Sequence, residues 1–186
     1  IEIKFFSRPK ILRKTPYLIF TSSNGVKAAG QATNNNIRAI CVGDRTTSLA
    51  SSLGYSAEKY GDNVEQLIKK LCLNKNIEGN ILHVRGKYTK VDLMDRLREA
   101  GFLCHEWEGY DQIAKNLSFH ALNAFKNGEK IILPIFSERS GRLLKDQIPN
   151  FDKCHIIAIS SAVANVFLNV SPASISGAQT PDLVGM

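Results

Sequence analysis

The stretch Phe20-Thr21-Ser22-Ser23-Asn24-Gly25-Val26 passes from an apolar run into small polar residues and then into an amphipathic segment. The apolar run, residues 17–20, has the length and composition of a buried strand. Ser22 is of a residue type that favours the N-terminus of a helix. Strand, polar turn and helix in this order predict the first part of a parallel α/β unit.

The same alternation continues outward from this stretch. In the first half of the chain we predict strands over residues 17–20, 37–42, 56–60 and 81–84, and helices over 23–33, 46–53, 64–71 and 90–100. In the second half we predict strands over 130–136 and 155–159, and helices over 117–127, 140–147 and 162–168. Strands that alternate with helices of this length indicate parallel sheets.

The two halves repeat one scheme. Ser22 and Gly43 each follow a strand and precede a helix, and Ser137 and Ser160 do so again with similar spacing. A pattern that recurs within the chain at similar spacing indicates repeated structural units. We therefore predict an α/β protein with two similar domains, whose parallel sheets are flanked by helices and joined by two extended connecting strands. The predicted boundaries are a connecting strand over 1–6, a complete domain over 7–103, a second connecting strand over 104–112 and a second domain over 113–186.

Four turns rich in small polar residues are candidate ligand sites. They cover residues 21–25, 43–47, 137–141 and 160–161. In open parallel sheets, ligands bind beyond the carboxyl ends of the strands. Backbone N–H groups and hydroxyls at helix N-termini suit anions, carboxylates among them. The same residue types also cap helices without binding anything, so both interpretations stay open.

Composition narrows the function class. The net charge is +7, but the basic residues are dispersed and most aromatic residues lie inside strand patterns, which disfavours nucleic-acid binding. A solvated surface with modest excess charge explains the charge equally well. No apolar run has the length of a membrane span, no signal peptide is recognisable, and the absence of an initiator Met suggests an incomplete N-terminus.

Cysteine and histidine spacing predicts neither a metal site nor a disulfide framework. The four cysteines are scattered without a C-x-x-C pair, and the four histidines are isolated. Cys41 and Cys154 lie in apolar strand-like runs, so we expect them to be buried thiols. We expect a reducing compartment, and hence a cytoplasmic protein. Neither a dinucleotide-binding G-x-G-x-x-G nor a phosphate-binding G-x-x-x-x-G-K-[ST] is present.

Further motifs lie in a fixed order along almost the whole chain. After Phe20-Thr21-Ser22 come Val42-Gly43-Asp44-Arg45-Thr46-Thr47-Ser48-Leu49, then Gly61, then Val84-Arg85-Gly86-Lys87 with Lys90, then Gly101 and Tyr110. The second half adds Phe136-Ser137-Glu138-Arg139-Ser140-Gly141, Ala158-Ile159-Ser160-Ser161 and Gln179-Thr180-Pro181. In this order the chain resembles the uroporphyrinogen-III synthases. It departs from them at Ser160, where the family has Gly. The family's first strand and helix would precede Ile1, so the resemblance predicts that the second domain lacks its N-terminal strand and helix.

The resemblance implies a cyclising lyase that works without a cofactor. Its substrate would be hydroxymethylbilane, a small, flexible, linear tetrapyrrole rich in carboxylates. The enzyme would close it to uroporphyrinogen III, with inversion of ring D and loss of water, as a monomer that binds neither nucleic acid nor membrane. Catalysis would rest largely on orientation.

The resemblance also suggests roles for single residues. The expected substrate-binding residues are Thr21, Ser22, Ser23, Gly43, Thr46, Arg85, Gly86, Ser137, Ser160 and Ser161. Tyr110 is the candidate general acid, since a phenol donates a hydrogen bond at neutral pH. Packing between the domains with Trp107 explains Tyr110 equally well, and a solvated helix start explains Arg85, Lys87 and Lys90. The alternative function is a non-catalytic two-domain binding protein for a small anionic ligand, which would bind its ligand without turnover.

Overall fold

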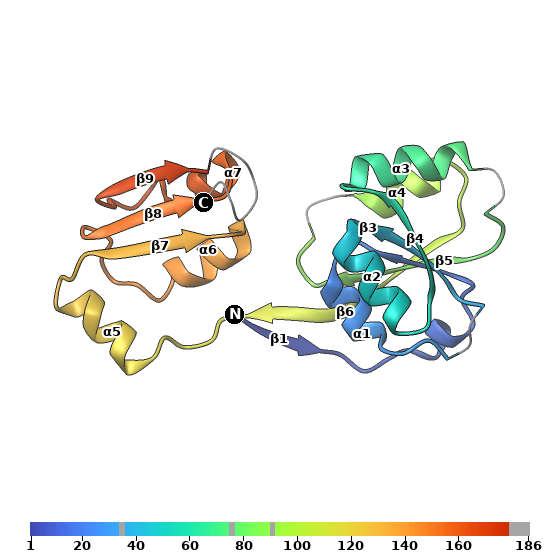
Figure 1. Cartoon of the computed structure of the whole chain (residues 1–186), viewed down its shortest axis with the longest axis horizontal. Coiled ribbons are helices and arrows are strands. Elements are labelled where there is room, and N and C mark those ends of the chain that lie inside the picture. Colours follow the sequence, from blue (N-terminus) through green and yellow to red (C-terminus); the bar gives the residue numbers. More distant parts are fainter. Residues whose placement is uncertain (34–35, 75–76, 90–91, 179–186) are drawn as a thin grey trace. The chain divides into compact units, whose positions relative to one another are not determined.

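The computed structural model describes residues 1–33, 36–74, 77–89 and 92–178. The chain divides into two units, a larger one over Ile3–Gln112 and a smaller one formed by Ile1–Glu2 together with Ile113–Met186 (Figure 1). Both units are α/β, as predicted. Within the described ranges, no helix has the length and apolar character needed to cross a bilayer.

The larger unit is built on a six-stranded sheet with the order β1-β6-β5-β2-β3-β4. Its strands are β1 (Glu2–Phe5), β2 (Tyr17–Phe20), β3 (Arg38–Val42), β4 (Ser56–Gly61), β5 (Ile81–Gly86) and β6 (Cys104–Ile113). The pairs from β6 to β4 are all parallel, whereas the arrow of β1 points opposite to that of β6 in Figure 1. The two segments predicted as connecting strands, 1–6 and 104–112, thus supply strands at one side of this sheet.

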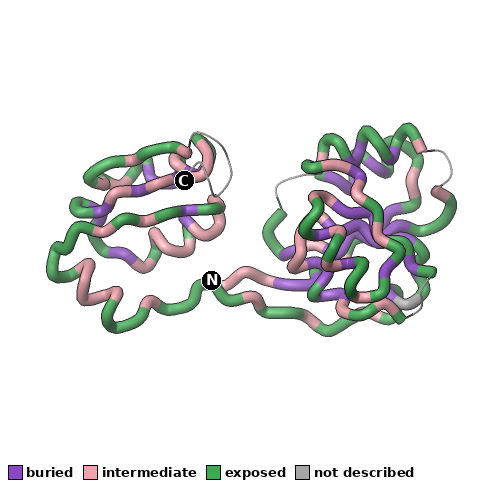
Figure 2. The backbone as a smooth tube through the Cα atoms, viewed as in Figure 1, coloured by how far each residue is buried: buried purple, intermediate pink, exposed green. Residues whose placement is uncertain are grey.

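Helices cover both faces of the larger sheet, and for this reason all four residues of β2 are buried. Helices α1 (Ser23–Ala29) and α2 (Asp44–Ser52) pack on the face that carries Leu18 and Phe20. Helices α3 (Val64–Leu73) and α4 (Leu93–Glu99) pack on the opposite face, which carries Tyr17 and Ile19. This division follows from the period of two along a strand. The buried strands stand out in Figure 2.

The smaller unit has a three-stranded parallel sheet in the order β7-β8-β9. Its strands are β7 (Ile131–Ile135), β8 (Cys154–Ala158) and β9 (Ser174–Gly177), and its helices are α5 (Phe119–Lys126), α6 (Glu138–Lys145) and α7 (Ser161–Ala164). The rings of Phe151 and Phe167 meet in its core, with centroids 5.9 Å apart.

Several predicted boundaries shift for local reasons. Helix α1 ends at Ala29 because Gly30 adopts a φ of 69°, a left-handed conformation that ends helices. Helix α2 begins at Asp44, with Gly43 as its N-cap at a φ of 76°. The predicted helix over 162–168 is the short α7 followed by a 3-10 turn, η2 (Asn165–Phe167), and a second 3-10 turn, η1 (Lys10–Arg13), precedes β2. Strand β9 was missed because Ser-Ile-Ser-Gly has no apolar run. Lys90 and Gln179-Thr180-Pro181 lie outside the described residues.

Candidate functional site

The carboxyl ends of β2, β3, β5 and β6 meet at one edge of the larger sheet because these strands run parallel. Most of the residues predicted to bind substrate in the first half of the chain lie there. Thr21, Ser22 and Ser23 follow β2, Gly43 follows β3, Arg85 and Gly86 end β5, and Tyr110 lies in β6. Residues far apart in sequence are therefore neighbours at this carboxyl edge.

The shortest contact between the predicted residues joins two hydroxyls. Ser22 Oγ and Tyr110 Oη are 2.9 Å apart, and either oxygen can be the donor. Ser22 Oγ also accepts a hydrogen bond from the N–H of Gly25 at 3.3 Å, which caps α1. Capping and contact with Tyr110 therefore coexist at Ser22, so the two interpretations of this turn do not exclude each other.

Tyr110 reaches Ser22 because of a bulge in β6. The pairing of β5 with β6 passes from Arg85–Glu108 directly to Gly86–Tyr110, which leaves Gly109 as an extra residue. An extra residue reverses the alternation of the residues that follow it. Tyr110 consequently joins the core on the α1 face, 9% exposed, where Trp107 is also partly buried.

Glycines make room for this arrangement. A Cβ atom on Gly86 would lie 2.9 Å from the ring of Tyr110, and a Cβ atom on Gly109 would lie 2.9 Å from the Cβ of Ala28. Both separations are shorter than van der Waals contact. Only glycine fits these two positions without a shift of the neighbouring groups. The ring of Tyr110 therefore packs directly against the backbone of Gly86.

On the opposite face of the sheet, Thr21 contacts His83. The Oγ1 atom of Thr21 lies 3.2 Å from Nε2 of His83. His83 is 4% exposed, and its burial lowers the pKa of the imidazole to about 4, with Arg85 adding to this effect and Glu106 opposing it. His83 is therefore neutral at neutral pH. Sequence reasoning treated it as an isolated histidine; a polar residue within the apolar run of β5 was the available signal.

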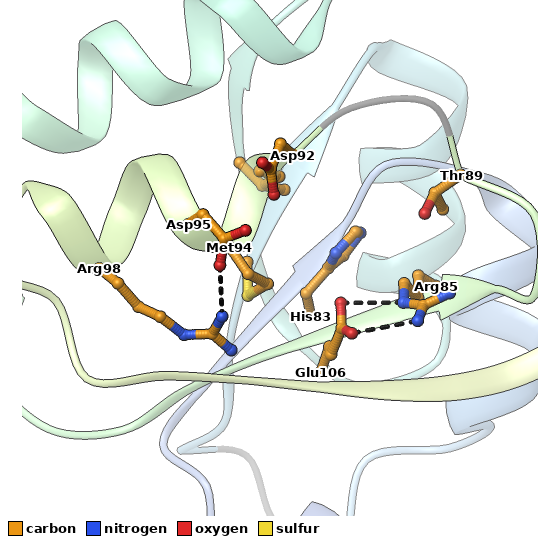
Figure 3. A pocket seen from close by; sticks show the side chains of 9 residues that line it. His83, Arg85, Thr89, Asp92, Met94, Asp95, Arg98 and Glu106 are labelled. Carbon is orange, nitrogen blue, oxygen red and sulfur yellow. Dashed lines mark hydrogen bonds and ion pairs between the residues drawn. The ribbon is translucent and has the colours of Figure 1, made fainter.

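His83 and Arg85 line a polar cavity of about 330 Å³, which lies between α4, strand β5 and the first half of β6 (Figure 3). The guanidinium of Arg85 donates to both carboxylate oxygens of Glu106, at 2.9 and 3.0 Å, and forms an ion pair with Glu108 at 3.1 Å. These carboxylates raise the pKa of Arg85, with the hydrogen bond to Glu106 as the largest cause. The charge of Arg85 is thus balanced inside the unit, whereas the prediction had assigned it to substrate carboxylates.

Thr46 and Gly43 occupy the turn after β3. Gly43 donates its N–H to the carbonyl of Gly61 at 2.8 Å, and its own carbonyl accepts from Thr47 Oγ1 at 2.9 Å. Thr46, predicted to bind substrate, is only 6% exposed. Little of this residue reaches the surface at the start of α2, so it can offer a ligand only a small contact.

The two predicted turns of the smaller unit differ from each other. Ser137 Oγ accepts from the N–H of Ser140 at 3.1 Å and pairs with Ser140 Oγ at 2.7 Å, so this hydroxyl caps α6. Ser160 also begins a helix, but its side chain makes no capping hydrogen bond, and Ser161 beside it is exposed. Since β7 and β8 are parallel, both turns lie at one edge of the smaller sheet.

The part of the chain that the structure describes contains no group of three or more His, Cys, Asp or Glu side chains suited to a metal ion. One buried polar atom at the carboxyl edge of the larger sheet has no hydrogen-bond partner among the described residues, Oδ1 of Asp111, next to Tyr110. Its second oxygen lies 3.8 Å from Nζ of Lys87.

Comparison with known proteins places this geometry in a family. The family model described as uroporphyrinogen-III synthase HemD matches residues 2–184. The solved uroporphyrinogen-III synthetase from Helicobacter pylori 26695 is similar with a TM-score of 0.76 and 19% identity, over 99% of this chain and 86% of that one. A mutant uroporphyrinogen III synthase from the extremely thermophilic bacterium Thermus thermophilus is similar with a TM-score of 0.52 and 12% identity, over 97% and 82% of the two chains. At these identities the two structures show a shared fold. No curated protein sequence matches the chain.

Proposed function

Because the chain belongs to the uroporphyrinogen-III synthase family HemD, whose members are cyclising lyases of haem biosynthesis, we propose that the carboxyl edge of its larger sheet binds and orients hydroxymethylbilane. The reaction closes this linear tetrapyrrole with loss of water and inversion of ring D. Closure without orientation would join the chain ends in the uninverted order. The task of the protein is therefore to hold reacting carbon atoms in one geometry, which is catalysis by proximity and orientation.

The observation that carries the proposal is the hydrogen bond between Ser22 and Tyr110. Ser22 Oγ already accepts the N–H of Gly25, so its own proton is available for donation to Tyr110 Oη. In that arrangement the phenolic proton of Tyr110 is directed away from Ser22. It can be donated to the departing hydroxyl of the substrate, which leaves as water. Tyr110 is the proposed acid, and Ser22 sets the orientation of its proton.

Substrate carboxylates need hydrogen-bond donors, and each unit offers a set of its own. In the larger unit we assign this role to the turn Thr21-Ser22-Ser23 and to the turn at Gly43, where backbone N–H groups begin α1 and α2. In the smaller unit we assign it to Ser137, Ser160 and Ser161, of which Ser160 has the hydroxyl not used for capping. Thr46 is only 6% exposed, so we assign it a contact through its hydroxyl alone.

Arg85 has a supporting role in this proposal. Its ion pairs with Glu106 and Glu108 tie the end of β5 to the part of β6 that precedes the bulge. These ion pairs fix the position of Gly86, against which the ring of Tyr110 packs. Arg85 thus positions the acid without contacting the substrate.

The test supplies freshly made hydroxymethylbilane and separates the uroporphyrinogen isomers. The unchanged protein should yield mainly isomer III, and Tyr110→Phe should form it severalfold more slowly because the phenolic donor is lost. Tyr17→Phe is the matched control: Tyr17 is equally buried but lies at the amino end of β2. An equal rate for Tyr110→Phe and Tyr17→Phe would remove Tyr110 from the reaction, and isomer I alone at every protein concentration would refute the activity.

The alternative of a non-catalytic binding protein has no support from the family match, which concerns an enzyme. We propose that the protein acts as a monomer in a cytoplasm. The free state of all four cysteines, three of them buried, supports a reducing compartment. Light scattering coupled to gel filtration tests the monomer directly.

A further inference from the structure

A second cavity lies at the amino edge of the larger sheet, opposite to the edge that carries Ser22 and Tyr110. It has a volume of about 430 Å³ and is bounded by the loop before β2, the C-terminal end of α1 and the residues that precede β3 and β4. Ile37 and Tyr55 stand directly before those two strands. This volume falls within the range that small-molecule sites occupy.

Positive charge gathers around this cavity without a compensating acid. Arg8, Lys10 and Lys14 line it, and no Asp or Glu among the described residues does. Across the described ranges, none of these three residues forms an ion pair. Arg8 is held in place, because its Nε donates to the carbonyl of Ala28 at 3.0 Å and its guanidinium lies over Gly30. Part of the positive surface is therefore pre-organised.

The hydroxyl of Tyr55 offers a hydrogen-bond donor beside the basic side chains. Tyr55 lines the cavity and is 5% exposed, and its ring packs edge-on against Phe20 with centroids 5.4 Å apart. Within the described part of the chain, its hydroxyl makes no hydrogen bond and is not one of the fully buried atoms, so a ligand can reach it. Burial raises the pKa of Tyr55 to about 12, so the phenol stays protonated at neutral pH and can donate a hydrogen bond. A hydroxyl with an unused proton at the wall of the cavity can donate a hydrogen bond to a bound anion.

We propose that this cavity binds an organic anion whose carboxylate or phosphate group meets Arg8, Lys10, Lys14 and the hydroxyl of Tyr55. Leu12 and Ile37 form apolar walls, so the ligand has an apolar body as well as a charged end. The site is separate from the proposed active site and does not depend on the function proposed above.

Isothermal titration calorimetry with octanoate, octyl phosphate and inorganic phosphate tests the site. We expect saturable binding of octanoate or octyl phosphate at one site, and the tighter of the two identifies the anionic group. Tyr55→Phe removes one oxygen atom and should weaken binding about tenfold, the loss expected for a hydrogen bond to a charged group. Lys10→Ala/Lys14→Ala should weaken it more, with a smaller dependence on salt.

The matched control is Lys69→Ala/Lys153→Ala, which removes the same charge from exposed residues that do not line the cavity. It should bind like the unchanged protein. The proposal is overturned if no probe saturates at millimolar concentration, or if the control weakens binding as much as Lys10→Ala/Lys14→Ala does. Inorganic phosphate binding as tightly as octyl phosphate would also overturn it, because the apolar walls would then contribute nothing. Thermal unfolding of each variant verifies that the fold is intact.

Discussion

Replacing His83 with Gln should change how the stability of the larger unit depends on pH. His83 is buried in β5 and its Nε2 lies 3.2 Å from Thr21 Oγ1. Glutamine places an amide nitrogen near the same position and keeps a hydrogen bond to Thr21 possible, but it does not titrate. The substitution therefore isolates the protonation of one imidazole.

The sign and size follow from the pKa of His83, which burial lowers from 6.5 to about 4. Above pH 6.5 the imidazole is neutral in both the folded and the unfolded chain, so it adds no pH dependence. Between pH 6.5 and 4 only the unfolded chain takes up the proton, so the free energy of unfolding falls as the pH falls. At about 1.4 kcal/mol per pH unit, the loss reaches about 2 kcal/mol at about pH 5 and about 3 kcal/mol below about pH 4.

Urea unfolding followed by tryptophan fluorescence measures this loss. The sequence contains a single tryptophan, Trp107, which lies in β6 of the larger unit and so reports on that unit. The difference in unfolding free energy between His83→Gln and the unchanged protein should move by about 2 kcal/mol in favour of the variant between about pH 8 and pH 5. His105→Gln, an exposed histidine on the same strand as Trp107, is the control and should show no such change. A difference that stays constant over this pH range would refute the reasoning.

Two further predictions concern packing. Gly86→Ala would place a Cβ atom 2.9 Å from the ring of Tyr110, so it should lower the rate of isomer III formation while circular dichroism shows an intact fold; an unchanged rate would mean that the position of Tyr110 is not critical. Phe167→Ala in the smaller unit removes a fully buried ring that contacts Phe151, and should lower the free energy of unfolding by about 3–5 kcal/mol in urea titrations followed by circular dichroism. A loss below about 1 kcal/mol would contradict the assignment of Phe167 to the core.

Local features of the sequence were enough for the α/β class and for the first strand and helix. Tyr17–Phe20 is an apolar run long enough for a buried strand, and Ser22 is a residue that caps helices. Both features depend only on residues close together in the sequence, so they can be recognised without knowing the tertiary structure. The order of such turns along the chain was sufficient to suggest the family, which the family model then matched.

Boundaries were less predictable because they depend on single backbone conformations and on pairing. The positive φ of Gly30 ended α1 earlier than the apolar pattern suggested. Strand β9 forms because its backbone pairs with β8, although its own residues carry little strand signal. Hydrogen bonding to a neighbouring strand is a property of the assembled sheet, and no local pattern reports it.

The stretch Phe20–Val26 by itself determined a strand, a capped turn and a helix, because propensity and capping act over a few bonds. Only the tertiary structure decided what Ser22 does there. The extra residue Gly109 shifts the register of β6 and brings the phenol of Tyr110 to Ser22. The charge of Arg85 is balanced by ion pairs with Glu106 and Glu108 of β6. Strand register and the pairing of charges between strands arise from packing across the sheet, where residues 88 positions apart in sequence come within hydrogen-bond distance.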